Sequence, residues 1–341
     1  MDTVVAAAVQ ATPVFLDREA TVAKSVKLIR EAGKAGAGLI VFGEAFIPTY
    51  PEWVWRLSPW DGPSGALYAK LLEQSVVIPG PVTESLGRAA RSAKAHVVMG
   101  VNERDPNGST IYNTLVYLAP DGSLLGTHRK LMPTGGERLV WGYGDGSTME
   151  VWDTPFGRLG GLLCWENYMP LARAAMYAKG LDIWIAATWD DSPVWVSTLQ
   201  HIAKEGRVHV IGVNSVIRAT DVPSTVPGYD EVWKGDDGWM SVGRSTIVEA
   251  GGEIVAGPLI EEEGILYAEL DSAKARGQRF TFDPVGHYAR PDVFELIVHE
   301  ERRSPVEASA RPAAAATVVG MRATRGPTNK RGPTNKRGKK T

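Results

Sequence analysis

Short apolar runs alternate along this chain with segments whose apolar residues recur at helical spacing. The run from Leu39 to Phe42 is apolar without interruption, which is typical of a strand buried on both faces. Between residues 21 and 35, Val22, Val26 and Ile29 fall on one helical face. The same criteria predict strands at 4–10, 97–101, 112–118, 124–128, 159–163, 183–187, 208–214, 245–248 and 254–256, and helices at 84–95, 169–179 and 199–207.

Two short dipeptides that contain glycine are predicted to form hairpin turns. Asp121-Gly122 lies between the strands at 112–118 and 124–128, and Gly251-Gly252 joins the last two predicted strands. Elsewhere helices separate the strands, so those strands are joined by crossovers. The pattern therefore predicts one layered α/β domain spanning residues 1–302.

The pattern ends near residue 303, where alanine, proline and basic residues take over. From Arg302 to Thr341 there are eleven Lys and Arg but one acid, and the hexapeptide Arg-Gly-Pro-Thr-Asn-Lys occurs twice in succession, from residue 325. Low hydrophobicity with high charge predicts a disordered basic tail over residues 303–341. This tail either solubilises the protein or docks on an acidic neighbouring subunit.

The bulk composition excludes several classes of protein. The net charge is −2, but without its basic tail the chain is acidic, so a nucleic-acid partner is not expected. No apolar run approaches the ~20 residues that span a bilayer, so a membrane partner is not expected either. The N-terminus has no basic segment typical of a signal peptide. We expect a cytoplasmic protein, where a lone cysteine stays reduced.

Cys164 is the only cysteine, so it can form neither an internal disulfide nor a multi-cysteine metal site. A free cysteine is often a buried filler, but this one ends an apolar strand that precedes the helix predicted at 169–179. Asn167 is expected to cap that segment, with Pro170 in its first turn. A nearby helix N-terminus favours a thiolate, so Cys164 is a candidate nucleophile.

A carboxylate is a better candidate base for this thiol than any of the six histidines, none of which lies in a protease signature. Glu44 directly follows the buried run that ends at Phe42, among aromatic residues that make a solvated position less favourable. Lys130 follows the second strand of a predicted hairpin; taken alone, it is an ordinary solvated lysine. The sequence contains no serine elbow, Gly-rich phosphate loop or metal-ligand cluster, so neither a metal nor an organic cofactor is expected.

Together these residues resemble the motifs of the nitrilase superfamily. Glu44 lies in its Phe-(Pro/Gly)-Glu segment, Lys130 in its Lys-Leu-x-Pro-Thr segment, and Cys164 in its Gly-x-x-x-Cys-Trp-Glu segment. The Trp-Glu-Asn after Cys164 resembles the true nitrilase branch. Gly43 is a departure, because many relatives have proline there. Further matches extend the resemblance over residues 4–298: 100–104, 112–114, 133–138, 140–142, 201–207 and 285–292.

The resemblance implies a role for each of these residues. Cys164 attacks a nitrile to form a thioimidate and then a thioester, with Glu44 as general base. Lys130 stabilises negative charge and helps to keep Cys164 ionised. Glu137 matches the family's second glutamate and supports Lys130. For Glu166, a structural role is at least as favourable as a catalytic one.

The resemblance also implies the fold, the assembly and the ligand. The fold is a four-layer α-β-β-α sandwich that dimerises to αββα-αββα, and nitrilases extend such dimers into larger spiral oligomers or helical filaments. The segment 285–298 resembles the part that crosses the interface. The small-molecule partner is a nitrile, and an aromatic or arylaliphatic one is expected because aromatic residues surround the site. We expect Tyr50, Trp53, Trp165 and Trp189 to contact it.

Three alternatives remain open on the sequence. An aliphatic amidase or carbamoylase on the same fold would share the thioester half-reaction. A binding or filament-forming protein would keep the site only as a vestige and use the basic tail as its contact. Redox sensing through Cys164 is disfavoured, because the chain has no second cysteine to resolve an oxidised one.

Overall fold

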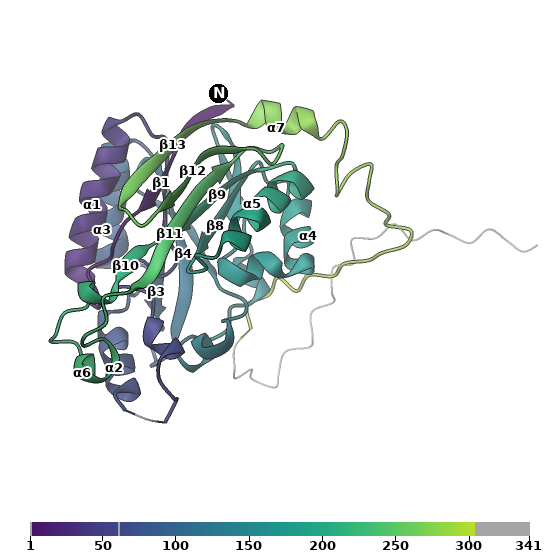
Figure 1. The fold of residues 1–341 in the computed structure, drawn as a ribbon. Coiled ribbons are helices and arrows are strands. Elements are labelled where there is room, and N and C mark those ends of the chain that lie inside the picture. Colours follow the sequence, from purple (N-terminus) through teal and green to yellow (C-terminus); the bar gives the residue numbers. More distant parts are fainter. Residues whose placement is uncertain (1, 61, 304–341) are drawn as a thin grey trace, which may run out of the picture.

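The computed structural model describes residues 2–60 and 62–303, which form two β-sheets stacked between two pairs of helices (Figure 1). The predicted disordered tail lies outside the described residues from residue 304 onward, and so does its repeated hexapeptide. No helix in the described ranges is long and apolar enough to cross a membrane.

The first sheet has six strands in the order β13-β1-β2-β3-β4-β5. Its middle is parallel, since β1 pairs with β2 and β2 with β3, whereas the outer pairings are antiparallel. The strands are β1 (Thr3–Gln10), β2 (Leu39–Phe42), β3 (His96–Arg104), β4 (Ile111–Leu118), β5 (Leu124–Arg129) and β13 (Gly264–Asp271).

The second sheet has seven strands in the order β10-β11-β9-β8-β7-β6, with β12 paired to β11. Here β7, β8 and β9 are parallel neighbours. The strands are β6 (Trp152–Thr154), β7 (Gly157–Gly161), β8 (Ile183–Thr188), β9 (His209–Asn214), β10 (Val216–Arg218), β11 (Trp239–Val248) and β12 (Ile254–Ile260).

Two pairs of helices cover the outer faces of the sheets (Figure 1). Helices α1 (Arg18–Lys34) and α3 (Pro81–Ala93) lie on the first sheet, and α4 (Pro170–Ala178) and α5 (Pro193–Gly206) lie on the second. Helices α2 (Ser64–Gln74), α6 (Tyr229–Val232) and α7 (Ser272–Gln278) lie outside these layers (Figure 1).

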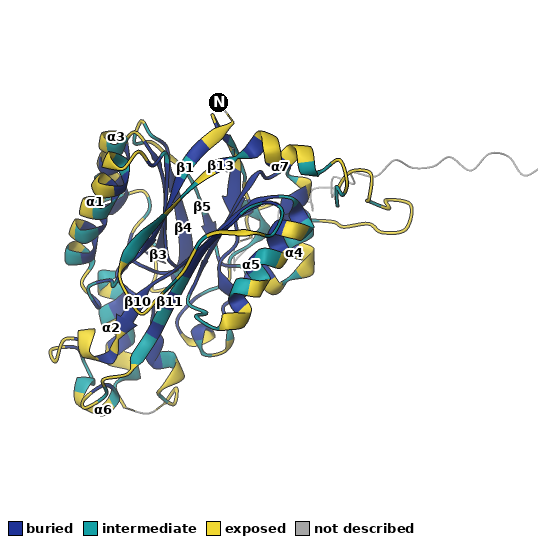
Figure 2. Cartoon of the chain, turned by 45° about the horizontal axis from the view of Figure 1, so that its top comes forward, coloured by how far each residue is buried: buried dark blue, intermediate teal, exposed yellow. Residues whose placement is uncertain are grey.

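Three apolar layers hold the four layers of secondary structure together. Along β2, Leu39 and Val41 point into the layer between the two sheets, whereas Ile40 and Phe42 point toward α1 and α3. A third layer joins the second sheet to α4 and α5. Figure 2 shows the result: the central strands are buried, and the helices that flank the two sheets are exposed mainly on their outer sides. The predicted α-β-β-α sandwich is confirmed, while the pairing of two sandwiches remains a prediction.

Most predicted elements occur, but several begin earlier than expected. Helix α5 begins at Pro193 instead of residue 199, and β11 begins at Trp239 instead of residue 245. The prediction missed β13. Apolar and polar residues partly alternate along this strand, but few of them are fully buried, so its apolar signal is weak. It also missed α6, α7, β6 and β10, which are short, and α2, although Leu67 and Leu71 form a buried apolar face on that helix.

Two glycines allow the backbone to pack closely beside the ends of β2 and β7. A Cβ atom at Gly100 would lie 2.1 Å from the carbonyl oxygen of Gly43, next to Glu44. A Cβ atom at Gly161 would lie 2.0 Å from the carbonyl oxygen of Ile185. Any side chain at these positions would therefore push apart the strands that position Glu44 and Cys164.

Candidate active site

The candidate residues lie where strands end, on the same side of both sheets. Glu44 follows β2, Lys130 follows β5, and Cys164 follows β7 after two residues. Glu137 belongs to the short 3₁₀ helix η2 (Gly135–Leu139), which comes soon after β5. The carboxyl ends of parallel strands meet at one edge of a sheet, and stacking the two sheets brings their edges together.

Lys130 links the two predicted carboxylates in a buried ion-pair network. Its Nζ donates to Glu44 Oε1 at 2.7 Å and to Glu137 Oε2 at 2.7 Å. The lysine and Glu44 side chains are fully buried, and that of Glu137 is 2% exposed. Tyr50 also donates its hydroxyl proton to Glu137 Oε1, at 2.7 Å. Lys130, a solvated residue when considered alone, is therefore a buried cation between two carboxylates.

Asn113 supports one oxygen of Glu44 and leaves the other free. Asn113 Nδ2 donates to Glu44 Oε1 at 2.6 Å, the oxygen that also accepts from Lys130. Glu44 Oε2 is buried and has no hydrogen-bond partner among the residues that the structure describes. The free oxygen can therefore accept a proton within a site that excludes bulk water.

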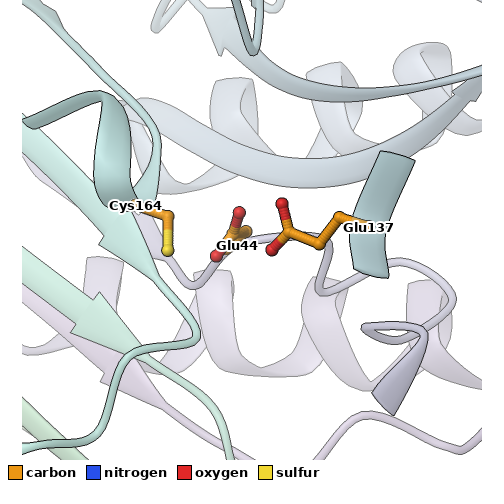
Figure 3. Close-up of side chains that lie close together, drawn as sticks. All are labelled: Glu44, Glu137 and Cys164. Carbon is orange, nitrogen blue, oxygen red and sulfur yellow. The ribbon is translucent and has the colours of Figure 1, made fainter. Parts of the chain in front are cut away.

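The thiol of Cys164 lies close to the carboxylates of Glu44 and Glu137 (Figure 3). Sγ of Cys164 and one carboxylate oxygen each of Glu44 and Glu137 all lie within 4.8 Å of one another. Thr188, at the end of β8, donates its hydroxyl proton to Sγ at 3.3 Å. Cys164 has φ = 48°, in the left-handed region that non-glycine residues rarely occupy. Such strain is common where a turn has to present one reactive side chain.

The environment of the sulfur favours a neutral thiol in the resting site. Burial raises the pKa of Cys164, the charge of Glu44 raises it further, and Lys130 lowers it less than these two raise it. Burial also raises the pKa of Glu44, despite the nearby ammonium group. For Lys130, burial lowers the pKa, but the anionic neighbours, Glu44 first, raise it above its usual value. Burial and Glu44 therefore oppose the predicted resting thiolate, and we expect ionisation to accompany attack on the substrate.

Local structure after Cys164 differs from the prediction. Cys164 begins a 3₁₀ helix, η4 (Cys164–Tyr168), and α4 follows with Met169 at its N-cap. Asn167 does not cap that helix, because its Nδ2 donates to the carbonyls of Leu162 (3.1 Å) and Cys164 (2.8 Å). Its amide therefore holds the nucleophile's turn from within.

A cavity of about 690 Å³ opens onto Cys164 and Glu137. Tyr50, Trp165 and Trp189 line it, as expected, and Tyr50 stacks on Trp189 with ring centroids 4.3 Å apart. Trp53 does not line it: this side chain is 2% exposed and packs on Phe15. The sequence could not show that Trp55, two residues later, takes that place in the cavity. The remaining lining residues include apolar, polar and charged side chains: Met132, Pro133, Thr134, Gly135, Arg138, Met169, Asp190, Asp191 and Met240.

Glu44, Glu137 and Cys164 also have the side-chain types that bind metal ions. However, Lys130 Nζ already donates to both carboxylates, so a positive charge occupies the centre of the donor set. A cation there would have to displace a buried ammonium group. This donor set therefore fits a nucleophile with its base and charge partner better than a metal site.

Sequence reasoning assigned no role to Asn113 or Thr188, although Asn113 lies in one of the matching segments. Both follow from the strand register: Asn113 lies in β4, where its neighbour Thr114 pairs with Arg129 next to Lys130, and Thr188 ends the strand beside β7. Only the sheet order shows which polar residue at a strand end faces which reactive group.

Replacement of Asn113 by alanine is expected to shift the acid limb of the activity profile to higher pH. Asn113 donates to the ionised carboxylate of Glu44 and so lowers its pKa; without that bond, the pKa rises further and the base is protonated at a higher pH. The measurement is kcat/KM against pH. Asn102→Ala is the matched control, because Asn102 pairs in register with Asn113 but donates to Thr49 instead of Glu44. An unshifted limb in Asn113→Ala would contradict the assignment of Glu44 as the base.

Comparison with known proteins agrees with this geometry. The family model described as carbon-nitrogen hydrolase matches residues 5–280. The chain belongs to this family. A carbon-nitrogen hydrolase from Helicobacter pylori has the same fold, with a TM-score of 0.67 at 23% identity, covering 86% of this chain and 97% of that one.

Among curated family members, nitrilases are similar over most of their length. The aliphatic nitrilase of Sinorhizobium fredii is 46% identical over 305 residues, covering 88% of this chain and 97% of the relative. The bifunctional nitrilase/nitrile hydratase NIT4B of Nicotiana tabacum is 43% identical over 316 residues, covering 89% and 88%. Within the carbon-nitrogen hydrolases, the chain therefore falls in the nitrilase branch.

Proposed function

We propose that this carbon-nitrogen hydrolase converts a nitrile and two waters into a carboxylic acid and ammonia, with Cys164 as nucleophile. The observation that carries the proposal is the approach of the Cys164 sulfur to the Glu44–Lys130–Glu137 network, beside a cavity that Cys164 and Glu137 line. Relatives that are named nitrilases support a nitrile as the substrate.

The first step forms a thioimidate. The sulfur of Cys164 attacks the nitrile carbon, one π bond of the C≡N group breaks, and its electron pair goes to nitrogen. Glu44 takes the thiol proton on its free oxygen and passes it to that nitrogen. Lys130 stabilises the negative charge that develops on nitrogen. The raised pKa of Glu44 suits this role, because a carboxylate with a higher pKa is a stronger base.

Two waters complete the reaction. The first water adds to the C=N bond of the thioimidate, and Glu44 takes one proton from this water and gives it to the nitrogen. The C–N bond then breaks as the new hydroxyl group becomes a carbonyl and its proton passes to the nitrogen, which leaves as ammonia. The thioester that remains is attacked by a second water, which releases the acid and returns the proton to the sulfur of Cys164. Glu137 keeps Lys130 oriented during both halves and receives support from Tyr50.

The cavity supports an apolar nitrile, and we propose an aromatic or arylaliphatic one. Trp55, Trp165 and Trp189 provide flat aromatic surface, and Met132, Met169 and Met240 provide apolar side chains that adapt to ligand shape. The volume of about 690 Å³ is large for a small aliphatic nitrile. Arg138, Asp190 and Asp191 also line the cavity and give it charged groups that can bind a polar substituent of the substrate.

A side-by-side assay of nitriles and amides tests the function. We expect the purified protein to release ammonia from benzonitrile or phenylacetonitrile faster than from benzamide. A preference for the amide would favour the alternative, an aliphatic amidase or carbamoylase. In the same assay, faster turnover of short aliphatic nitriles than of arylacetonitriles would overturn the substrate proposal but leave the nitrilase proposal standing.

A binding or filament-forming protein with a vestigial site is a weaker alternative. The raised pKa of Cys164 does not support it, because burial and Glu44 explain a neutral resting thiol in a working site as well.

We also propose self-association through residues 285–298, where Tyr288 and Phe294 expose 61% and 76% of their surface. A cytoplasmic location remains part of this proposal.

A further inference from the structure

His128 and Glu166 form a buried pair that the reaction proposed above does not use. His128 lies in β5 two residues before Lys130, and Glu166 lies in η4 two residues after Cys164. Nε2 of His128 is 3.0 Å from Oε2 of Glu166, and the two side chains are 2% and 0% exposed. The register partner of His128 is Leu115, which packs in the apolar layer between the sheets. The pair therefore joins the first sheet to the second.

The carboxylate of Glu166 also holds the backbone on both sides. The amide of Leu163, directly before Cys164, donates to Oε2 at 2.7 Å. The amide of Leu131, directly after Lys130, donates to Oε1 at 2.6 Å. One buried carboxylate is therefore bonded next to the nucleophile and next to the catalytic lysine.

The hydrogen bonds of His128 require a proton on each ring nitrogen when Glu166 is ionised. Nδ1 lies 3.0 Å from the carbonyl oxygen of Thr148, which can only accept, and Nε2 faces the carboxylate. Burial lowers the pKa of His128, but the charge of Glu166 and these bonds raise it above its usual value. Tyr117, on β4, lies close enough to Glu166 to be affected by the charge of its carboxylate. Burial, and then the charge of Glu166, raises the pKa of the Tyr117 hydroxyl, so this side chain stays neutral.

We propose that the His128–Glu166 ion pair is a positioning device that sets the distance from Lys130 to the sulfur of Cys164. Lys130 and Cys164 come from different sheets, and apolar packing between sheets fixes a distance less sharply than directional hydrogen bonds do. Glu166 fixes both chain segments to one point, and His128 neutralises its buried charge. The inference rests on the proposed function only in taking Lys130 and Cys164 as the reacting groups.

Replacement of Glu166 by glutamine tests the device. The amide keeps the size of the side chain, but its NH₂ group cannot accept from a backbone N–H, so one of the two amide bonds is lost. Because a misplacement of about 1 Å can cost on the order of 100-fold in rate, we expect kcat to fall by about 100-fold while KM changes little. Asp182→Asn is the matched control: Asp182 is also buried and accepts from Arg158 N and Arg276, but it lies at the opposite end of β8. The Asp182→Asn variant should have a lower free energy of unfolding and an unchanged kcat.

Two further measurements test the proposal without depending on nitrile turnover or on the folding of Glu166→Gln. The rate at which iodoacetamide alkylates Cys164, the only thiol, should fall in Glu166→Gln but not in Asp182→Asn, and this readout needs no nitrile turnover. If Glu166→Gln does not fold, a pH titration of the unaltered protein followed by ¹⁵N-histidine spectra should show His128, assigned with His128→Gln, keeping both nitrogens protonated to a higher pH than free histidine does. A folded Glu166→Gln protein with kcat within twofold of the original, or a His128 that becomes neutral at the same pH as free histidine or at a lower one, would overturn the proposal. Failure of the unaltered protein to hydrolyse nitriles or amides would instead overturn the proposed function.

Discussion

Cys164→Ala is expected to release no measurable ammonia from nitriles, a loss of at least about 10⁴-fold in kcat. The sulfur is the group that bonds to the nitrile carbon, and no other thiol exists in the chain to replace it. The fold should survive, because alanine keeps the same backbone and leaves the Glu44–Lys130–Glu137 network intact. The measurement is ammonia release together with the melting temperature.

Mass spectrometry supplies an independent check on this variant. In the unaltered protein, acid quenching during turnover should trap an acyl adduct on Cys164, and Cys164→Ala should carry none. Thr188→Val is the control, since it removes only the hydroxyl that donates to Sγ and should retain the adduct. Substantial turnover by Cys164→Ala would refute the proposed mechanism.

Lys130→Met is expected to lose about 10³-fold in kcat/KM and also to destabilise the fold. Methionine fills a similar volume but leaves the carboxylates of Glu44 and Glu137 buried without their shared cation. Removing one partner of a buried ion pair commonly lowers the free energy of unfolding by about 3 to 5 kcal/mol. The measurements are steady-state kinetics and calorimetric melting at several pH values.

The stability deficit of Lys130→Met should depend on pH in a definite direction. Without the ammonium group, the pKa of Glu44 in the folded protein rises further above its value in the unfolded chain. A carboxyl group whose pKa is raised on folding stabilises the fold below the unfolded pKa, and that contribution is lost as pH rises through the folded pKa. The deficit should therefore be large at pH 8 and smaller near pH 5.

Lys130→Arg separates the charge from the shape of the side chain. Arginine returns a positive charge, so part of the lost stability should return, whereas its planar fork does not reproduce a compact ammonium group between two carboxylates. Activity of Lys130→Arg should therefore stay low.

A Lys130→Met protein that keeps more than a tenth of the activity would rule out Lys130 as a group that stabilises the reacting nitrogen.

The sequence predicted the central strands well because burial on both faces leaves a strong local signal. Leu39–Phe42 is apolar throughout since its alternate residues fill two different layers, and β2 has the predicted bounds. Elements near the surface lack that signal. Strand β13 was missed because its pairing with β1, 254 or more residues away along the chain, decides its structure.

The sequence likewise predicted some features of the candidate site and missed others. Motif resemblance named Glu44, Lys130, Glu137 and Cys164, and three of four expected aromatic residues line the cavity. Trp53 does not, because in the short helix Glu52–Trp55 neighbouring side chains point in different directions, and only packing decides which one reaches the cavity. The motif also gave no sign that burial raises the pKa of Cys164, because the degree of burial is not visible in a motif.

By itself, the sequence determined the layered α/β class, the lone thiol and the family to which its motifs belong, because periodicity and residue type are local properties. The tertiary structure decided that Glu166 joins the segments of Lys130 and Cys164, that Asn113 and Thr188 contact the reactive groups, and that burial raises the pKa of the thiol. Each of these depends on which strand ends meet across two sheets and on how completely water is excluded there. Distance and burial are properties of the folded chain, and they control both hydrogen bonding and the cost of a charge.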